Sequence, residues 1–170
     1  VYPRLFNNSF MMSACALFEY HIKKICDVVK EEHKLPLELD HMEKASVPTK
    51  FKRFLGLAGV TLKDEDPDSF EHWFARVMPG QREWRVDELW QEIENHFRVR
   101  NCIAHHDGFV QRLRYPDKIT MYATRRGILA EINGQKELSL SQDFNKDVCD
   151  TMAKFFGKLT SAYYSTPLPE

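Results

Sequence analysis

Apolar residues recur at intervals of three and four positions along most of the chain, and this spacing predicts amphipathic helices. Short runs typical of β-strands are confined to one region in the last third of the sequence. The predicted helices span Phe10–Val29, Pro48–Leu57, Ser69–Val77, Arg85–Ala104 and Gln142–Tyr164. The pattern therefore predicts a mainly α protein.

The expected helix ends carry residues that commonly start or stop helices. Asn8 or Ser9 would cap the first helix, and Pro48 fits the first turn of the second. Gly59 would end the second helix, and Asp107-Gly108 would end the long fourth one. These signals predict separate helices, and the polar segment Glu31–Ser46 between the first two is expected to form a loop or a short helix.

A small antiparallel β-hairpin is expected as an insertion before the last helix, at about residues 117–141. Its β-like runs are Ile119–Tyr122, Ile128–Ile132 and Leu138–Leu140. Asn133-Gly134 between the last two runs is a strong signal for a tight turn. The sequence thus predicts a helical bundle that carries one hairpin.

Composition fits a single globular domain over residues 1–170. Hydrophobic residues make up 43% and charged residues 29% of the 170 positions. No apolar run approaches the roughly 18 residues of a membrane span, and nothing at the start resembles a signal peptide. The four cysteines form no C-x-x-C pair, which argues against a zinc ribbon or a redox motif. A cytoplasmic protein without membrane partners is expected.

Charge is distributed unevenly although the net charge is only −1. The stretch from Arg98 to Arg126 holds seven basic and two acidic residues, a net charge of +5, whereas the remaining chain carries −6. Ordinary solvated surface is one interpretation of this stretch. Contact with a polyanion such as RNA is the other.

The long fourth helix has polar side chains beside its apolar stripe near the C-terminal end. At about 100° per residue, Arg100 falls about 40° to one side of the stripe, and Asn101 and His105 lie one turn apart on the opposite flank. Gly108 would let the chain bend away and leave His105 accessible. The stripe itself consists of Val86, Leu89, Trp90, Ile93, Phe97 and Ala104.

Two interpretations fit this terminal turn. In the first, Arg100 pairs with a neighbouring carboxylate and His105 interacts with the helix C-terminus, where a cation is favourable. In the second, both side chains belong to a site, because a guanidinium beside a core face is costly unless it is paired or faces a cleft.

The string Arg-Asn-Cys-Ile-Ala-His-His-Asp-Gly over residues 100–108 resembles the active-site signature of the HEPN superfamily. The specific part covers about a dozen residues. The segment Ala16–Tyr20 also resembles the first bundle helix of that group, and a hairpin before the last helix resembles its RiboL-PSP type and bacterial relatives. The resemblance implies a HEPN-like helical bundle.

The resemblance also implies metal-independent RNA cleavage by a homodimer, in which two motifs face each other. His105 would act as general acid or base, Arg100 would stabilise charge on the phosphate, and Asn101 would orient a reacting group. No metal or cofactor is expected. Residues expected to contact RNA are His106, Arg112, Arg114, Arg125 and Arg126.

Alternative functions stay open at this point. His105, His106 and Asp107 could hold a metal ion, although neighbours on one helical turn point in divergent directions. A non-catalytic HEPN module could bind nucleotides, RNA or a protein, and a purely structural dimerisation domain is a third possibility. If the chain is an endoribonuclease, a toxin or defence effector is expected, with an antitoxin or regulatory protein as a further partner.

Overall fold

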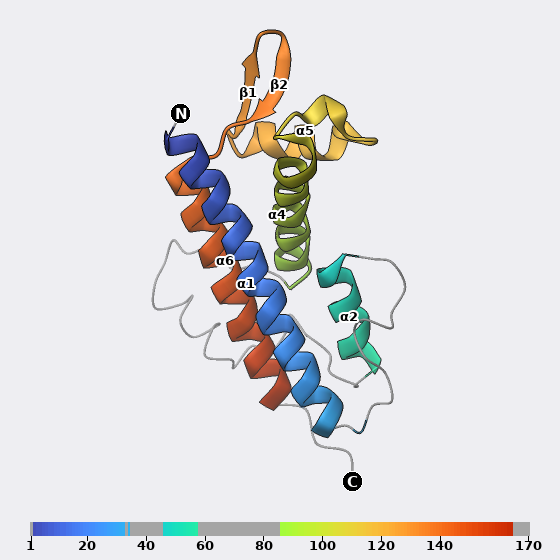
Figure 1. The fold of residues 1–170 in the computed structure, drawn as a ribbon. Helices are drawn as coiled ribbons and strands as arrows, with labels where there is room; N and C mark the ends of the chain where they lie inside the picture. Colours follow the sequence, from blue (N-terminus) through green and yellow to red (C-terminus); the bar gives the residue numbers. More distant parts are fainter. Residues whose placement is uncertain (1, 33, 35–45, 58–85, 165–170) are drawn as a thin grey trace, which may run out of the picture.

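Three long helices form the body of the computed structural model, which describes residues 2–32, 34, 46–57 and 86–164 (Figure 1). The mainly helical fold with one small antiparallel sheet before the last helix is confirmed. The elements in chain order are α1 (Tyr2–Glu32), α2 (Val47–Leu57), α4 (Val86–His106), the short 3-10 helix η2 (Val110–Arg112), α5 (Pro116–Arg125), β1 (Leu129–Ile132), β2 (Gln135–Leu138) and α6 (Gln142–Tyr164).

Helices α1 and α6 lie side by side and run in the same direction (Figure 1). Near their first turns, the Asn145 side chain donates hydrogen bonds to the backbone oxygen and Oδ1 of Asn7, at 3.3 and 3.1 Å. Farther along, the ring centroids of His21 and Phe156 lie 6.0 Å apart. The two helices therefore pack against each other in parallel over several turns.

Helix α4 runs in the opposite direction against this pair. Its Trp90 ring contacts Phe155 late in α6 at 4.8 Å between centroids, whereas its His96 ring lies 5.8 Å from Phe144 near the start of α6. The C-terminal end of α4 consequently meets the N-terminal ends of α1 and α6 and the connection to the hairpin (Figure 1).

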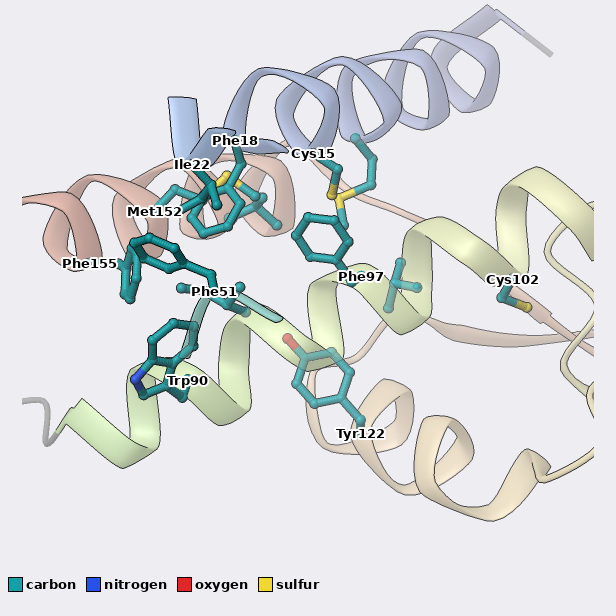
Figure 2. Packing of buried hydrophobic residues seen from close by; sticks show 14 of the residues in the cluster. Cys15, Phe18, Ile22, Phe51, Trp90, Phe97, Cys102, Tyr122, Met152 and Phe155 are labelled. Atoms are coloured by element: carbon teal, nitrogen blue, oxygen red, sulfur yellow. The ribbon is translucent and has the colours of Figure 1, made fainter. Parts of the chain in front are cut away.

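The core between these helices is rich in aromatic rings (Figure 2). The Phe18 ring lies 5.8 Å from Phe97, 5.5 Å from Phe155 and 5.2 Å from Phe156, measured between centroids. Helix α2 adds Phe51, whose ring lies 6.1 Å from that of Trp90. Offset and edge-on aromatic contacts of this kind add to the stabilisation from burial.

The first helix begins at Tyr2, so the predicted N-cap at Asn8 or Ser9 is wrong. Pro3 occupies the first turn, where a missing N–H costs nothing. The Asn7 side chain instead donates to the backbone oxygen of Leu140 at 2.8 Å. The Asn7 amide thus forms a tertiary contact with the segment that precedes α6. Helix α1 continues through Asn7.

The predicted strand Ile119–Tyr122 is also wrong, because these residues lie in helix α5. Pro116 starts that helix, and the buried residues Ile119, Tyr122 and Ala123 follow helical spacing. The region of about 117–141 therefore contains a helix followed by a hairpin, and not a hairpin alone.

The hairpin itself is confirmed, with Asn133 and Gly134 at its turn. Both residues have positive φ, of 51° and 73°, as a tight two-residue turn requires. This turn pairs Ile132 with Gln135, so the returning strand ends at Leu138. The expected strand Leu138–Leu140 was placed too late in the sequence.

Several expectations lie outside the described residues. These are the predicted helix Ser69–Val77, the start of the long helix at Arg85 and the helix end at Gly59. In the described part of the chain, no helix is long and apolar enough to cross a membrane.

Candidate functional site at the end of helix α4

The signature residues of α4 divide between the core and the surface. Cys102 is buried and Ile103 packs partly against the core, whereas Asn101 and His105 are exposed. Burial raises the pKa of the Cys102 thiol to about 11, so this sulfur is not a thiolate at neutral pH. Ala104 is exposed, which corrects its placement in the apolar stripe. Asn101 and His105 therefore share the solvent side of α4.

Arg100 is half-buried and bonds to its neighbour in the sequence. Its Nη1 donates a hydrogen bond to Oδ1 of Asn101 at 2.9 Å. Its Nε is buried without a hydrogen-bond partner in the described structure. No described carboxylate lies within ion-pair distance of its guanidinium, so the salt-bridge interpretation finds no partner there. The guanidinium thus crosses from its own flank of the helix to that of Asn101.

Helix α1 borders this arginine. Burial raises the pKa of Cys15 on α1 to about 12, and the positive charge of Arg100 opposes that rise. Helices α1 and α4 pack against each other. Arg100, whose Nε is buried, lies on the part of α4 whose charge acts on this α1 thiol.

The chain reverses directly after the signature by means of two residues with positive φ. Asp107 has φ of 55° and Gly108 of 84°. The Gly108 N–H donates to the Cys102 carbonyl at 3.1 Å and its carbonyl accepts from the Leu138 N–H at 2.9 Å. The turn thereby ties the end of α4 to the second hairpin strand and leaves His105 at the surface.

Arg4 of α1 also contacts the turn that follows α4. Its Nη2 donates to the Asp107 carbonyl at 3.3 Å, and it forms an ion pair with Glu137 of β2. The Glu137 side chain is only 3% exposed. Arg4 was not among the predicted site residues, because 103 positions separate it from Asp107 and no local pattern links them.

Two of the predicted RNA-contacting arginines lie next to this turn. Arg112 donates to Oδ2 of Asp107 at 3.1 Å, and its Cζ lies 4.4 Å from the Phe109 ring centroid. Arg114 follows on the exposed side of the same connection. His106 is half-buried. Contact of His106, Arg112 and Arg114 with RNA stays a prediction.

Arg125 and Arg126 instead have internal carboxylate partners. Arg125 donates to Oε1 of Glu92 at 2.9 Å. Arg126 pairs with Asp147 of α6 and lies 3.9 Å from Oε2 of Glu92. These ion pairs join α5 to α4 and α6, so both arginines have a role in holding the fold together. Their contact with RNA stays a prediction.

The His and Asp side chains of the signature bear on whether the site can hold a metal ion. Within the ranges that the structure describes, no group of three or more His, Cys, Asp or Glu side chains is placed to hold a metal ion. His105, His106 and Asp107 do not form such a group, and Asp107 engages Arg112. The chemistry available here is that of an imidazole, an amide and a guanidinium.

Comparisons with protein-family models, with curated proteins and with solved structures found no match to this chain. Any assignment of function therefore depends on the side chains at the end of α4.

Proposed function

We propose that this chain is a metal-independent endoribonuclease of the HEPN type that acts as a homodimer. One observation carries the proposal: Arg100 is half-buried without a described carboxylate partner, while His105 is exposed five residues later on the same helix. A partly desolvated guanidinium without a counter-ion favours an anionic ligand. The phosphate of RNA is such a ligand.

The proposed reaction is a transesterification within the RNA strand. The ribose 2′ oxygen loses its proton and bonds to the adjacent phosphorus, the bond from phosphorus to the 5′ oxygen breaks, and that oxygen takes up a proton. His105 supplies proton transfer, for which an imidazole suits neutral pH. Arg100 stabilises the negative charge that builds on the phosphate and cannot lose its own proton.

Asn101 is proposed to position the Arg100 guanidinium, a more specific role than orienting the imidazole. Its Oδ1 already accepts the Arg100 bond, so the amide group fixes the direction of the guanidinium. Its Nδ2 makes no hydrogen bond with another described residue. The two N–H groups of that nitrogen can donate to a phosphate oxygen beside Arg100.

Dimerisation follows from the two proton transfers. One proton leaves the 2′ oxygen and one reaches the 5′ oxygen, on opposite sides of the phosphorus, whereas one signature contributes one exposed imidazole, His105. Two chains with their signatures facing each other supply both groups. We further place the enzyme in the cytoplasm as a toxin or defence effector, restrained by an antitoxin or regulatory protein.

The test is cleavage of a labelled RNA by purified protein in excess EDTA. Wild type is expected to cleave, and Arg100→Ala and His105→Ala are each expected to lose about 10²-fold or more in rate, as for removal of one group that acts on the transition state. His21→Ala, at an exposed histidine of α1, is the matched control and should keep full activity. Circular dichroism checks that each variant folds.

Two results would contradict the proposal. If His105→Ala cleaves at the wild-type rate, the imidazole has no catalytic role. If wild type binds RNA in EDTA but does not cleave it, the non-catalytic HEPN module becomes the better description.

A further inference from the structure

Two large side chains in the basic stretch are unusually exposed. Tyr115 is 72% and Met121 is 74% exposed, more than any other large apolar side chain that the structure describes. Both belong to the segment Arg98–Arg126 with its net charge of +5. A ring so exposed contributes little to the core, because the apolar area it removes from water is small.

The exposed tyrosine has a cation against its face. The guanidinium carbon Cζ of Arg114 lies 5.2 Å from the centroid of the Tyr115 ring. Neither Arg114 nor Lys118 has a carboxylate partner in the part of the chain that the structure describes. An aromatic ring with one unpaired cation, Arg114, against it is therefore presented to solvent.

Local contacts connect this tyrosine to the end of α4. The Phe109 N–H donates to the His106 carbonyl at 2.8 Å, and the Leu113 N–H donates to the Val110 carbonyl at 3.1 Å. Ten positions separate His105 from Tyr115, and a 3-10 turn shortens the path between them. Tyr115 directly precedes α5, which crosses the end of α4 (Figure 1).

We propose that Tyr115 and Arg114 form a subsite that binds an unpaired base and its phosphate in single-stranded RNA, beside the phosphate that is cleaved. This inference rests on the proposed function and adds the class of substrate. Bases of single strands stack on aromatic rings and on guanidinium planes, whereas bases in a duplex are already stacked on each other. Arg114 and Lys118, which have no carboxylate partner among the described residues, favour a nucleic acid over an apolar protein partner.

Binding is measured separately from cleavage, in the His105→Ala background, by fluorescence anisotropy with a labelled single-stranded RNA and with the same RNA annealed to its complement. Tyr115→Ala is expected to weaken single-strand binding about tenfold. Tyr115→Phe keeps the ring and should keep the affinity. Preference for the single strand over the duplex should fall in Tyr115→Ala.

Tyr20→Ala is the matched control. Tyr20 of α1 is also an exposed tyrosine, at 57%, and Lys24 Nζ lies 5.9 Å from its ring centroid. It lies outside the basic stretch, so its loss should leave RNA affinity unchanged. The pair of variants separates a stacking subsite from a general effect of an exposed ring with a nearby cation.

Salt dependence separates stacking from charge. Arg114→Ala should lower the slope of log affinity against log salt by about 0.7, the value for one phosphate contact on a single strand, whereas Tyr115→Ala should leave the slope unchanged. Equal single-strand affinity of Tyr115→Ala and its parent would overturn the subsite even if wild type cleaves RNA. Loss of affinity in Tyr115→Ala with no cleavage by wild type would support the subsite and refute the nuclease.

Discussion

His96 and His105 lie on the same helix and have opposite surroundings. His96 is fully buried, with its ring 6.4 Å from Tyr122 and 5.8 Å from Phe144, and neither nitrogen has a partner among the described residues. Burial, and secondarily the charge of Arg126, lower its pKa to about 3. His96 is therefore neutral at pH 7 and serves packing, whereas His105 meets solvent.

The depressed pKa of His96 predicts a loss of stability in acid. The unfolded chain takes up a proton near pH 6.5 and the folded chain only near pH 3, so protonation of His96 leaves stability unchanged well above pH 6.5 and lowers it by up to about 1.4 kcal/mol per pH unit between those values. Urea unfolding of wild type and His96→Phe between pH 7 and 4.5 measures this slope.

His96→Phe is expected to flatten the slope, because a phenyl ring fits among the same aromatic neighbours and cannot be protonated. His21→Phe, at the exposed histidine of α1, should retain the wild-type slope. The account of His96 would be wrong if wild type and His96→Phe lost stability in parallel.

At the scale of single elements, the turn after α4 decides where the signature faces. Gly108 has φ of 84°, which a residue with a Cβ adopts only at a cost, although an added Cβ would meet Glu137 and Leu138 at an ordinary 3.7 Å. Gly108→Ala should therefore destabilise the protein by about 1–2 kcal/mol through its backbone and not through a clash.

Gly157→Ala supplies the matched control for that substitution. Gly157 lies inside α6, and an added Cβ there meets no heavy atom within 4 Å. Alanine should stabilise this helix by about 0.5–1 kcal/mol. Thermal and urea unfolding of both variants at one pH give the comparison. A neutral Gly108→Ala would show that the turn tolerates a side chain.

Helix α5 depends on Arg126 more than on Arg125. The Arg126 side chain is 24% exposed and pairs with Asp147, whereas Arg125 is 65% exposed. Arg126→Ala is expected to cost about 2 kcal/mol, because it leaves Asp147 without its ion-pair partner and Glu92 with Arg125 alone, and Arg125→Ala less than about 1 kcal/mol. Equal effects of the two substitutions on the unfolding free energy would contradict this difference.

The element boundaries show what local sequence can predict. The long helices follow from apolar spacing, and the last one spans the predicted Gln142–Tyr164. The predicted strand Ile119–Tyr122 is wrong for two reasons. Its β-branched and aromatic residues favour strands, and a run of four residues fits the helical period of apolar positions as well as the strand period. Its helical state depends on Ile119 and Tyr122 reaching the core and on Pro116 starting the helix.

At the scale of the whole molecule, the candidate site was predictable only in its local part. The exposed positions of Asn101 and His105 follow from helical spacing and from the Gly108 turn. The bond from Arg100 to Asn101 did not follow, because a wheel gives Cβ directions and not the reach of a guanidinium. The contact of Arg4 with the turn could not be predicted from the sequence, because only the packing of α1 brings this residue to the turn.

Assembly into a composite site predicts that an inactive chain impairs its wild-type partner. Wild-type protein is mixed with an excess of His105→Ala protein, unfolded and refolded so that subunits exchange. A mixed dimer holds one His105 and not the two that the proposed reaction uses, so cleavage per wild-type chain should fall as the share of His105→Ala chains rises. Cleavage per wild-type chain that stays constant, although sedimentation shows dimers, would indicate that each chain acts alone.

The chemical end of the RNA product tests the central claim most directly. Wild-type protein in excess EDTA should release fragments that end in a 2′,3′-cyclic phosphate, because the 2′ oxygen of the same strand is the nucleophile. Mass spectrometry of the fragments identifies this end, and His105→Ala should yield none above background. Fragments with a 3′ hydroxyl, or cleavage that stops in EDTA and returns with a divalent ion, would contradict metal-independent transesterification at Arg100 and His105.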